Sequence, residues 1–351
     1  MMAEEAELLR KSVREFAQKT IEPVSVKIEQ DGLGAQAVGG LAAQGFLGAR
    51  IPAEYGGSGL DEQGYLVVLE ELARCSPSAA VRVLITNSLF TPLLLSSGKG
   101  VSVLGDVASG SLNASVAYAA ALEGHGPASG LSVADSRVNG RLDYVLNADA
   151  NVMIAPTAAP SEGLLLLRGG FRPAEDYPRL GFKGLRFAAI QVDSAEYERV
   201  SDLGSKQLMG AVSGMDLEIA ALSLGIASGA LAKAVEYSKA RNTFEHPLKD
   251  YQPIAFGLSL LRAEEDLLRE FLYSDSLSSA QKTMARVKGL ALARSATKQA
   301  LQVHGGYGYF EDFGVEKFYR DAMALSILFG RSSKDLERLS EGVYGTKAGF
   351  L

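Results

Sequence analysis

The sequence predicts a mixed α+β multidomain protein with an N-terminal helical domain, a small antiparallel β-barrel or sandwich, and a C-terminal four-helix bundle. Two changes of pattern along the chain carry this prediction. Helical periodicity gives way near Ala114 to short β-like runs separated by turn residues, and long helical runs return beyond roughly Met209. We therefore expect domains at residues 1–113, 114–205 and 206–351.

The N-terminal part is expected to be helical because apolar residues recur at helical spacing against charged ones. This stripe contains Leu9, Val13, Phe16 and Thr20. Further helices are predicted at residues 35–44 and 62–73, joined by a Pro/Gly-rich loop at residues 45–60. Residues 85–95 are left unassigned.

Six short strands are predicted in the middle of the chain, with turn clusters at residues 124–127 and 159–163 between them. The predicted strands cover residues 115–121, 131–138, 142–146, 152–154, 164–167 and 188–192. Several short strands punctuated by turns are typical of a small antiparallel barrel or sandwich.

Four long helical runs follow, and their lengths and short connections predict a bundle. The first begins after residues 213–216 and ends near Arg241, and the others cover residues 253–272, 279–303 and 315 to about 339.

The composition is that of a soluble globular protein. Of 351 residues, 47% are hydrophobic and 22% are charged, and the formal net charge of −6 argues against nucleic acid as the main ligand. The single cysteine, Cys75, excludes an intrachain disulfide, and residues 1–10 lack the apolar core of a secretory signal. No uninterrupted apolar run approaches the ~20 residues that cross a bilayer. We expect a cytoplasmic protein that binds neither nucleic acid nor membrane, and the scattered histidines predict no metal site.

Two sequence phrases near the C-terminus carry the functional signal. Residues 241–252 read RNTFEHPLKDYQ, and Gln302-Val303-His304-Gly305-Gly306-Tyr307-Gly308-Tyr309 is followed by VEKFYRDA at residues 315–322. The paired glycines permit a positive φ and a close backbone approach where a helix ends. Together with the loop at residues 45–60, these phrases resemble the acyl-CoA dehydrogenase family over nearly the whole chain.

The resemblance implies the acyl-CoA dehydrogenase fold and FAD as cofactor, clasped between two subunits of a homo- or hetero-oligomer, a dimer or tetramer. It assigns FAD binding to Arg241, Phe244, Gln252, Gln302, Gly305 and Gly306. An arginine fork suits a pyrophosphate in a way that lysine cannot copy.

The resemblance also implies a carboxylate that removes the α-proton of an acyl thioester. At the usual position of this carboxylate, the chain departs from the family pattern. Where the commonest branch of the family has glutamate, seven residues beyond Ala322, this chain has Phe329. The isovaleryl and long-chain branches place the glutamate in a Gly-Leu-Asp-Leu-Glu phrase, which residues 214–218 resemble, and this nominates Glu218. Ungapped counting from Arg241 places Met215 there instead, about one helical turn away. A solvated first-turn glutamate is the alternative reading of Glu218.

A second departure concerns the residues that touch the flavin. The family's Thr-Glu-Pro loop and Trp-Ile-Thr strand correspond to residues 120–126 and 151–155, and the chain contains no tryptophan.

The leading hypothesis is FAD-dependent α,β-dehydrogenation of an acyl-CoA or acyl-carrier thioester, with an electron-transfer flavoprotein or oxygen as acceptor. The alternatives are a catalytically silent subunit that completes the FAD site of an active homologue, and a flavin oxidase or monooxygenase on the same fold.

Overall fold

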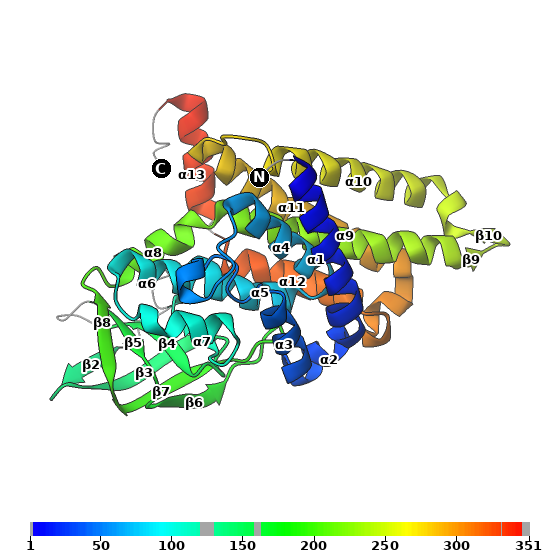
Figure 1. Cartoon of the computed structure of the whole chain (residues 1–351). Coiled ribbons are helices and arrows are strands. Elements are labelled where there is room, and N and C mark those ends of the chain that lie inside the picture. The colour runs from blue at the N-terminus through cyan, green and yellow to red at the C-terminus, as the bar shows by residue number, and fades with distance from the viewer. Residues whose placement is uncertain (1–2, 120–129, 158–162, 331, 346–351) are drawn as a thin grey trace.

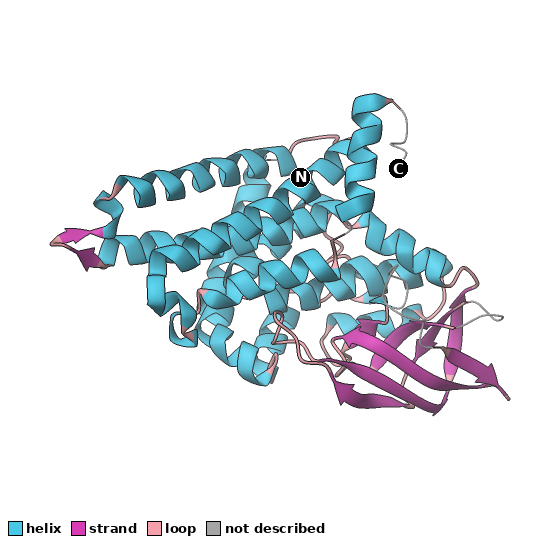
Figure 2. Ribbon diagram, turned by 180° about the vertical axis from the view of Figure 1, so that it is seen from behind, coloured by secondary structure: helices cyan, strands magenta, loops and turns pink. Residues whose placement is uncertain are grey.

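The computed structural model describes residues 3–119, 130–157, 163–330 and 332–345. Helices form one elongated body, and the strands gather at one side of it (Figures 1 and 2). The mixed α+β architecture that the sequence predicts is confirmed. The predicted domain boundaries after residues 113 and 205 stay predictions.

The N-terminal part is a set of helices around a buried pair. The outer helices are α1 (Ala3–Phe16), α2 (Ser25–Asp31), α3 (Ala35–Ala43) and α7 (Leu104–Ala108). The inner elements are α4 (Glu62–Cys75) and a continuous helix of α5 (Pro77–Leu84), η4 (Ile85–Phe90) and α6 (Thr91–Ser97). The η4 segment is a π-helix, and it occupies the stretch that the sequence left unassigned. Short π-helical segments inside helices are frequent at functional sites.

The β-domain consists of two four-stranded sheets that face each other. The sheet next to the helical body has the order β1-β4-β5-β8, from β1 (Ala114–Val116), β4 (Val152–Pro156), β5 (Leu164–Leu167) and β8 (Tyr197–Ser201). The outer sheet has the order β2-β3-β7-β6, from β2 (Leu131–Ala134), β3 (Arg137–Leu146), β7 (Phe187–Ala195) and β6 (Phe171–Asp176). All pairings inside the two sheets are antiparallel except that of β1 with β4.

Strands β4 and β5 are buried on both faces, which explains their unbroken apolar sequences. Met153 and Leu165 point into the core between the two sheets, whereas Ile154 and Leu166 belong to the core shared with the helices. The β-domain therefore packs firmly on the helical body.

The C-terminal part is the predicted bundle with one correction. Its helices are α8 (Ser205–Gly214), α9 (Asp216–Ala240), α10 (Gln252–Leu272), α11 (Ser279–His304), α12 (Glu316–Leu328) and α13 (Ser332–Tyr344). The single helix predicted from residue 315 to about 339 is wrong, because α12 ends at Leu328 and α13 is a separate helix that begins at Ser332. Where α12 ends, the backbone of Gly330 passes so close to the carbonyl of Ser326 that a Cβ would collide with it, which favours glycine here.

Helix α9 lies at the centre of the molecule and contacts α4 and α11 closely. A Cβ at Gly225 would collide with the carbonyl of Glu70, and one at Gly289 would press on Ala220 at 3.2 Å. By length and mean hydropathy alone, α9 and the helix Pro77–Ser97 are long enough to cross a membrane. Inside the fold, 78% and 89% of their apolar windows are buried, as in core helices of a globular protein.

Candidate active site

Glu218 lies in the first turn of α9, where the helix passes beside the N-terminal helices. Ser88 of η4 donates a hydrogen bond to Glu218 Oε1 at 3.5 Å. The hydroxyl groups of Ser88 and Tyr65 are 2.8 Å apart, and Tyr65 belongs to α4. Helices α4, η4 and α9 thus bring together a short chain of polar groups that runs from Tyr65 through Ser88 to the Glu218 carboxylate.

The environment of Glu218 favours the protonated form of its carboxyl group. Burial is the main cause, and repulsion from Glu62 and Asp216 adds to it, against a hydrogen bond from its own backbone N–H and attraction by Arg50. Together they raise the pKa of Glu218 to about 7. Glu218 keeps partial solvent exposure, so a proton can be exchanged with water. A carboxyl group with a pKa near neutrality is suited to general base catalysis.

Phe329, at the position counted for the late glutamate, is fully buried at the end of α12. Its ring stacks on Tyr118 with a centroid distance of 5.3 Å and an interplanar angle of 21°. This position contributes packing and no proton acceptor. Met215, the alternative from ungapped counting, is the N-cap residue of α9 and is 1% exposed. Of these three positions, only Glu218 carries a group that can accept a proton.

The residues assigned to FAD come together at the far end of the bundle. Arg241 ends α9, Gln252 begins α10, and Gln302 lies in the last turn of α11. The set of Arg241, Phe244, Gln252, Gln302, Gly305 and Gly306 is exposed throughout. Between α9 and α10, the hairpin of β9 (Asn242–Thr243) and β10 (His246–Pro247) projects from the body and carries Phe244 at its tip (Figure 1).

The geometry of this end fits the phosphate and adenosine half of a dinucleotide. The Arg241 guanidinium lies over the Tyr307 ring, 5.7 Å from its centroid, which leaves its fork open to solvent. Gly305 has φ +57°, and no atom lies within 4 Å of a Cβ built at Gly305 or Gly306. The backbone is therefore open to a close ligand approach. Exposed aromatic side chains surround the set, with Phe244 86% and Tyr309 84% exposed.

The distance between Glu218 and Arg241 shows whether one ligand can reach both ends of α9. Glu218 and Arg241 are 23 positions apart on a continuous helix, which corresponds to about 35 Å. This exceeds the length of an extended dinucleotide. One FAD molecule cannot reach both groups of residues in the same chain, so the set around Arg241 suits a ligand shared with a second subunit.

Most of the segment matched to the Trp-Ile-Thr strand, residues 151–155, offers no side chain to a ligand. Asn151 is exposed, but residues 152–155 lie in β4 and are buried in the cores on either side of the sheet. The segment matched to the Thr-Glu-Pro loop, residues 120–126, lies outside the described residues. The flavin-ring half of the site thus departs from the family pattern where the structure describes it.

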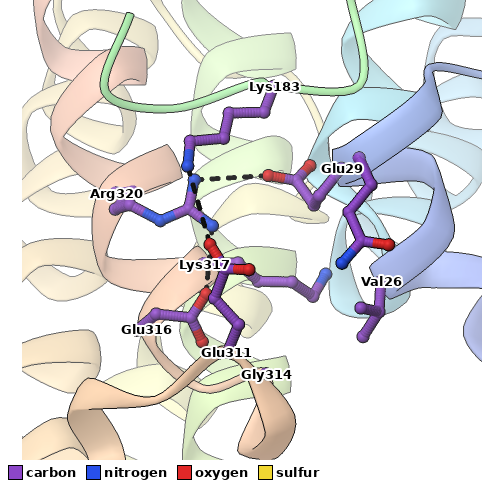
Figure 3. A pocket seen from close by; sticks show the side chains of 9 residues that line it. Val26, Glu29, Lys183, Glu311, Gly314, Glu316, Lys317 and Arg320 are labelled. Atoms are coloured by element: carbon purple, nitrogen blue, oxygen red, sulfur yellow. Dashed lines mark hydrogen bonds and ion pairs between the residues drawn. The ribbon is translucent and has the colours of Figure 1, made fainter.

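Arg320 and Asp321 connect α12 to the N-terminal helices and to the β-domain. Arg320 forms ion pairs with Glu29 of α2 at 3.3 Å and with Glu316 at 3.0 Å, in a cleft lined by charges of both signs (Figure 3). Asp321 accepts a hydrogen bond from the backbone N–H of Phe182 at 2.6 Å. Burial raises the pKa of Asp321 to about 7. The pair connects the loop between β6 and β7 to α12 and α2.

Comparison with known proteins identifies the family. Residues 3–100 match the model of the acyl-CoA dehydrogenase N-terminal domain, and residues 202–344 match that of the C-terminal domain. The chain belongs to the acyl-CoA dehydrogenase family. Both matched segments contain residues of the candidate site, since Tyr65 and Ser88 lie in the first and Glu218 and Arg241 in the second.

Sequence similarity to named relatives extends over almost the whole chain. A 3-(aryl)acrylate reductase of Clostridium sporogenes is 28% identical over 94% of this chain and 96% of its own length. The caffeyl-CoA reductase-Etf complex subunit CarC of Acetobacterium woodii is 29% identical, with the same coverage. The butyryl-CoA dehydrogenase structure from Megasphaera elsdenii superimposes with a TM-score of 0.84 at 22% identity, covering 98% of this chain and 99% of that one. That structure supports the fold.

Sequence reasoning missed Ser88, which donates to Glu218 across 130 positions of sequence, and Tyr65, whose hydroxyl group contacts that of Ser88. A signal was present in the chain. Thr86, Asn87 and Ser88 form a polar triplet between the apolar residues 83–85 and 89–90, and all three are buried. Buried polar triplets of this kind need partners, which makes them candidates for a site.

Proposed function

We propose that the protein dehydrogenates the α,β-bond of an acyl thioester, with Glu218 as the base that removes the α-proton. The observation that carries this proposal is the Glu218 carboxyl group, whose pKa is raised to about 7 and which Ser88 holds by a hydrogen bond. The named relatives act on 3-(aryl)acrylate and caffeyl-CoA, and a solved neighbour is a prolyl acyl carrier protein oxidase. The caffeyl-CoA relative supports redox chemistry on a thioester.

The chain's own residues would hold the substrate proton and one half of the cofactor. FAD supplies the hydride acceptor for the β-carbon when it is bound. Glu218 takes the α-proton and can return it to solvent through its partial exposure, while Ser88 stabilises the ionised carboxylate that must be present before each turnover. Arg241, Gln302 and the Gly305-Gly306 turn would hold the pyrophosphate and adenosine.

The assembly we propose is an oligomer in which each FAD is clasped between two subunits. The distance of about 35 Å between Glu218 and Arg241 supports this arrangement. The exposed aromatic rings of Phe244 and Tyr309 are suited to burial against another subunit. We propose a cytoplasmic location, with an electron-transfer flavoprotein or oxygen as electron acceptor.

A silent subunit is the second candidate function, and the buried stack of Phe329 on Tyr118 favours it. Phenylalanine at this position removes the late glutamate, and the buried β4 strand leaves no side chain for the flavin ring. In this case Arg241 and Gln302 would complete the FAD site of an active homologue.

Purification of the chain alone separates the two candidates. Under the proposed function the protein is yellow, and its flavin absorbance bleaches when butyryl-CoA or a butyryl-carrier thioester is added anaerobically. The Glu218→Gln variant keeps the colour and loses the bleaching, whereas Glu264→Gln, which removes an exposed carboxylate on α10, behaves as wild type. A colourless chain that becomes yellow only with a co-expressed homologue overturns the proposal in favour of the silent subunit.

A further inference from the structure

The buried hydroxyl group of Tyr65 is linked to the candidate base through a single neighbour. Tyr65 is 2% exposed on α4, and its Oη lies 2.8 Å from Ser88 Oγ. Within the described ranges of the chain, no other group forms a hydrogen bond with this hydroxyl. Ser88 Oγ in turn lies 3.5 Å from Glu218 Oε1. Tyr65 therefore acts on the carboxyl group of Glu218 only through Ser88.

The direction of these two hydrogen bonds follows from counting their hydrogens. A hydroxyl group has one hydrogen to donate and lone pairs to accept, whereas an ionised carboxylate only accepts. If Ser88 donated to Tyr65, the buried Tyr65 hydrogen would have no acceptor and Glu218 would lose its donor, and both losses are costly. If Tyr65 donates to Ser88, the Ser88 hydrogen is left for Glu218 and every hydrogen has an acceptor. The second arrangement is the stable one whenever Glu218 is ionised.

Tyr65 keeps its hydrogen while Glu218 gains and loses a proton. Burial, and then the negative charge of Glu218, raise the pKa of Tyr65 well above its usual range, against the hydrogen bond with Ser88 and attraction by Arg50. Tyr65 is thus a hydrogen-bond donor and not an acid in this chain of groups.

Glu218 depends on Ser88 for a side-chain donor. Arg50 attracts the Glu218 carboxylate and its own backbone N–H donates to it, but burial and the charges of Glu62 and Asp216 oppose ionisation. Among the described residues, no other side chain donates a hydrogen bond to this carboxyl group. A hydrogen bond is stronger to an ionised acceptor, and a hydroxyl that itself accepts a hydrogen bond donates more strongly. The pair of hydroxyl groups therefore favours the ionised form of Glu218.

We propose that Tyr65 is a positioning residue that holds the Ser88 hydroxyl hydrogen on Glu218, so that the carboxylate is ready to accept the α-proton; this rests on the proposed role of Glu218 as base. After the proton has moved from the α-carbon to Glu218, the carboxyl group is neutral and its hydrogen bond with Ser88 is weaker. The same two hydroxyl groups then favour release of that proton to water, which the partly exposed Glu218 can reach.

The pKa of Glu218 in the protein as isolated tests this role without turnover. It is read over a pH titration from the infrared band of the protonated carboxyl group, as the difference between each variant and the same variant with Glu218→Gln. Tyr65→Phe removes one oxygen and keeps the ring, and we expect it to raise the pKa of Glu218 by about 0.5 unit, less than Ser88→Ala does. In the Ser88→Ala background, Tyr65→Phe should add no further shift. Ser88→Thr keeps a hydroxyl group and should retain both the wild-type pKa and its response to Tyr65→Phe.

Tyr273→Phe is the matched control, because it removes a tyrosine hydroxyl that donates to another buried carboxylate, Glu70, at 2.8 Å. It should leave the pKa of Glu218 unchanged. During turnover of butyryl-CoA, the acidic limb of the pH profile of kcat/KM should move to higher pH in Tyr65→Phe by the same amount as the infrared titration. The rate on the alkaline side of this limb should stay close to wild type.

The outcomes separate this role from the function on which it rests. The positioning role is overturned by an unchanged Glu218 pKa in Tyr65→Phe, by an equal shift in Tyr273→Phe, or by a further shift when Tyr65→Phe is added to Ser88→Ala. Each of these results leaves the dehydrogenase function standing if the wild type turns over. The expected infrared shifts in a protein that neither bleaches nor turns over with an acyl thioester overturn the dehydrogenase function and leave the hydrogen-bonded chain standing.

Discussion

Replacement of Glu218 by glutamine should stabilise the protein in a way that depends on pH. The pKa of Glu218 is raised from 4.5 to about 7 in the folded protein. Between these pH values the folded protein retains a proton that the unfolded chain releases, so stability falls as the pH rises through this window and is constant above it. Glutamine has no proton to lose and should escape this penalty.

The magnitude follows from the size of the shift. The difference between 4.5 and about 7 corresponds to about 3 kcal/mol at 1.36 kcal/mol per pKa unit. Solvent screening at the partly exposed side chain reduces this to about 2 kcal/mol. For a chain of this length, we expect a melting temperature roughly 3 °C above wild type at pH 8.

Thermal unfolding of wild type, Glu218→Gln and the control Glu264→Gln between pH 4.5 and pH 8 measures the effect. The Glu218→Gln curve should coincide with wild type at pH 4.5 and separate from it as the pH rises, while the control stays with wild type throughout. A difference that is the same at every pH, or a variant that melts below wild type at pH 8, would refute the reasoning about burial of this carboxyl group.

Three further predictions address the neighbours of the site. Ser88→Ala removes a donor to the ionised Glu218, so the acidic limb of the pH–rate profile should move to higher pH by less than about one unit; an unchanged limb contradicts this role. Arg241→Lys should weaken FAD binding about tenfold because the planar fork is lost, as measured by flavin retained after dialysis, and full retention contradicts the assignment. Phe329→Ala should lower stability by about 3 to 4 kcal/mol through the cavity and the lost stack on Tyr118; a melting temperature equal to wild type would show that this stack is dispensable.

Periodicity predicted the helices well because burial follows their pattern. The helix predicted at residues 279–303 is α11 (Ser279–His304). Its N-cap residue, Ser278, forms a capping box at the start of the helix. The strand predicted at residues 131–138 is in fact a hairpin whose turn at Asp135 and Ser136 has positive φ, a feature not visible as a Gly or Pro in the sequence. Strand β6 (Phe171–Asp176) was missed because it is largely exposed and polar, with no apolar alternation to detect.

The candidate site was only partly predictable for a physical reason. Glu218 and Arg241 were found through local phrases, which a sequence displays directly. The contacts of Ser88 with Glu218 and with Tyr65 depend on which distant elements pack together, and nothing in the local sequence displays them.

An anaerobic visible spectrum of the purified chain during titration with an acyl-CoA tests the central claim most directly. The account predicts that the protein carries flavin, that the thioester bleaches it, and that Glu218→Gln retains the flavin without bleaching. Flavin that bleaches equally in Glu218→Gln, or a chain that binds no flavin in any oligomer it forms by itself, would contradict it.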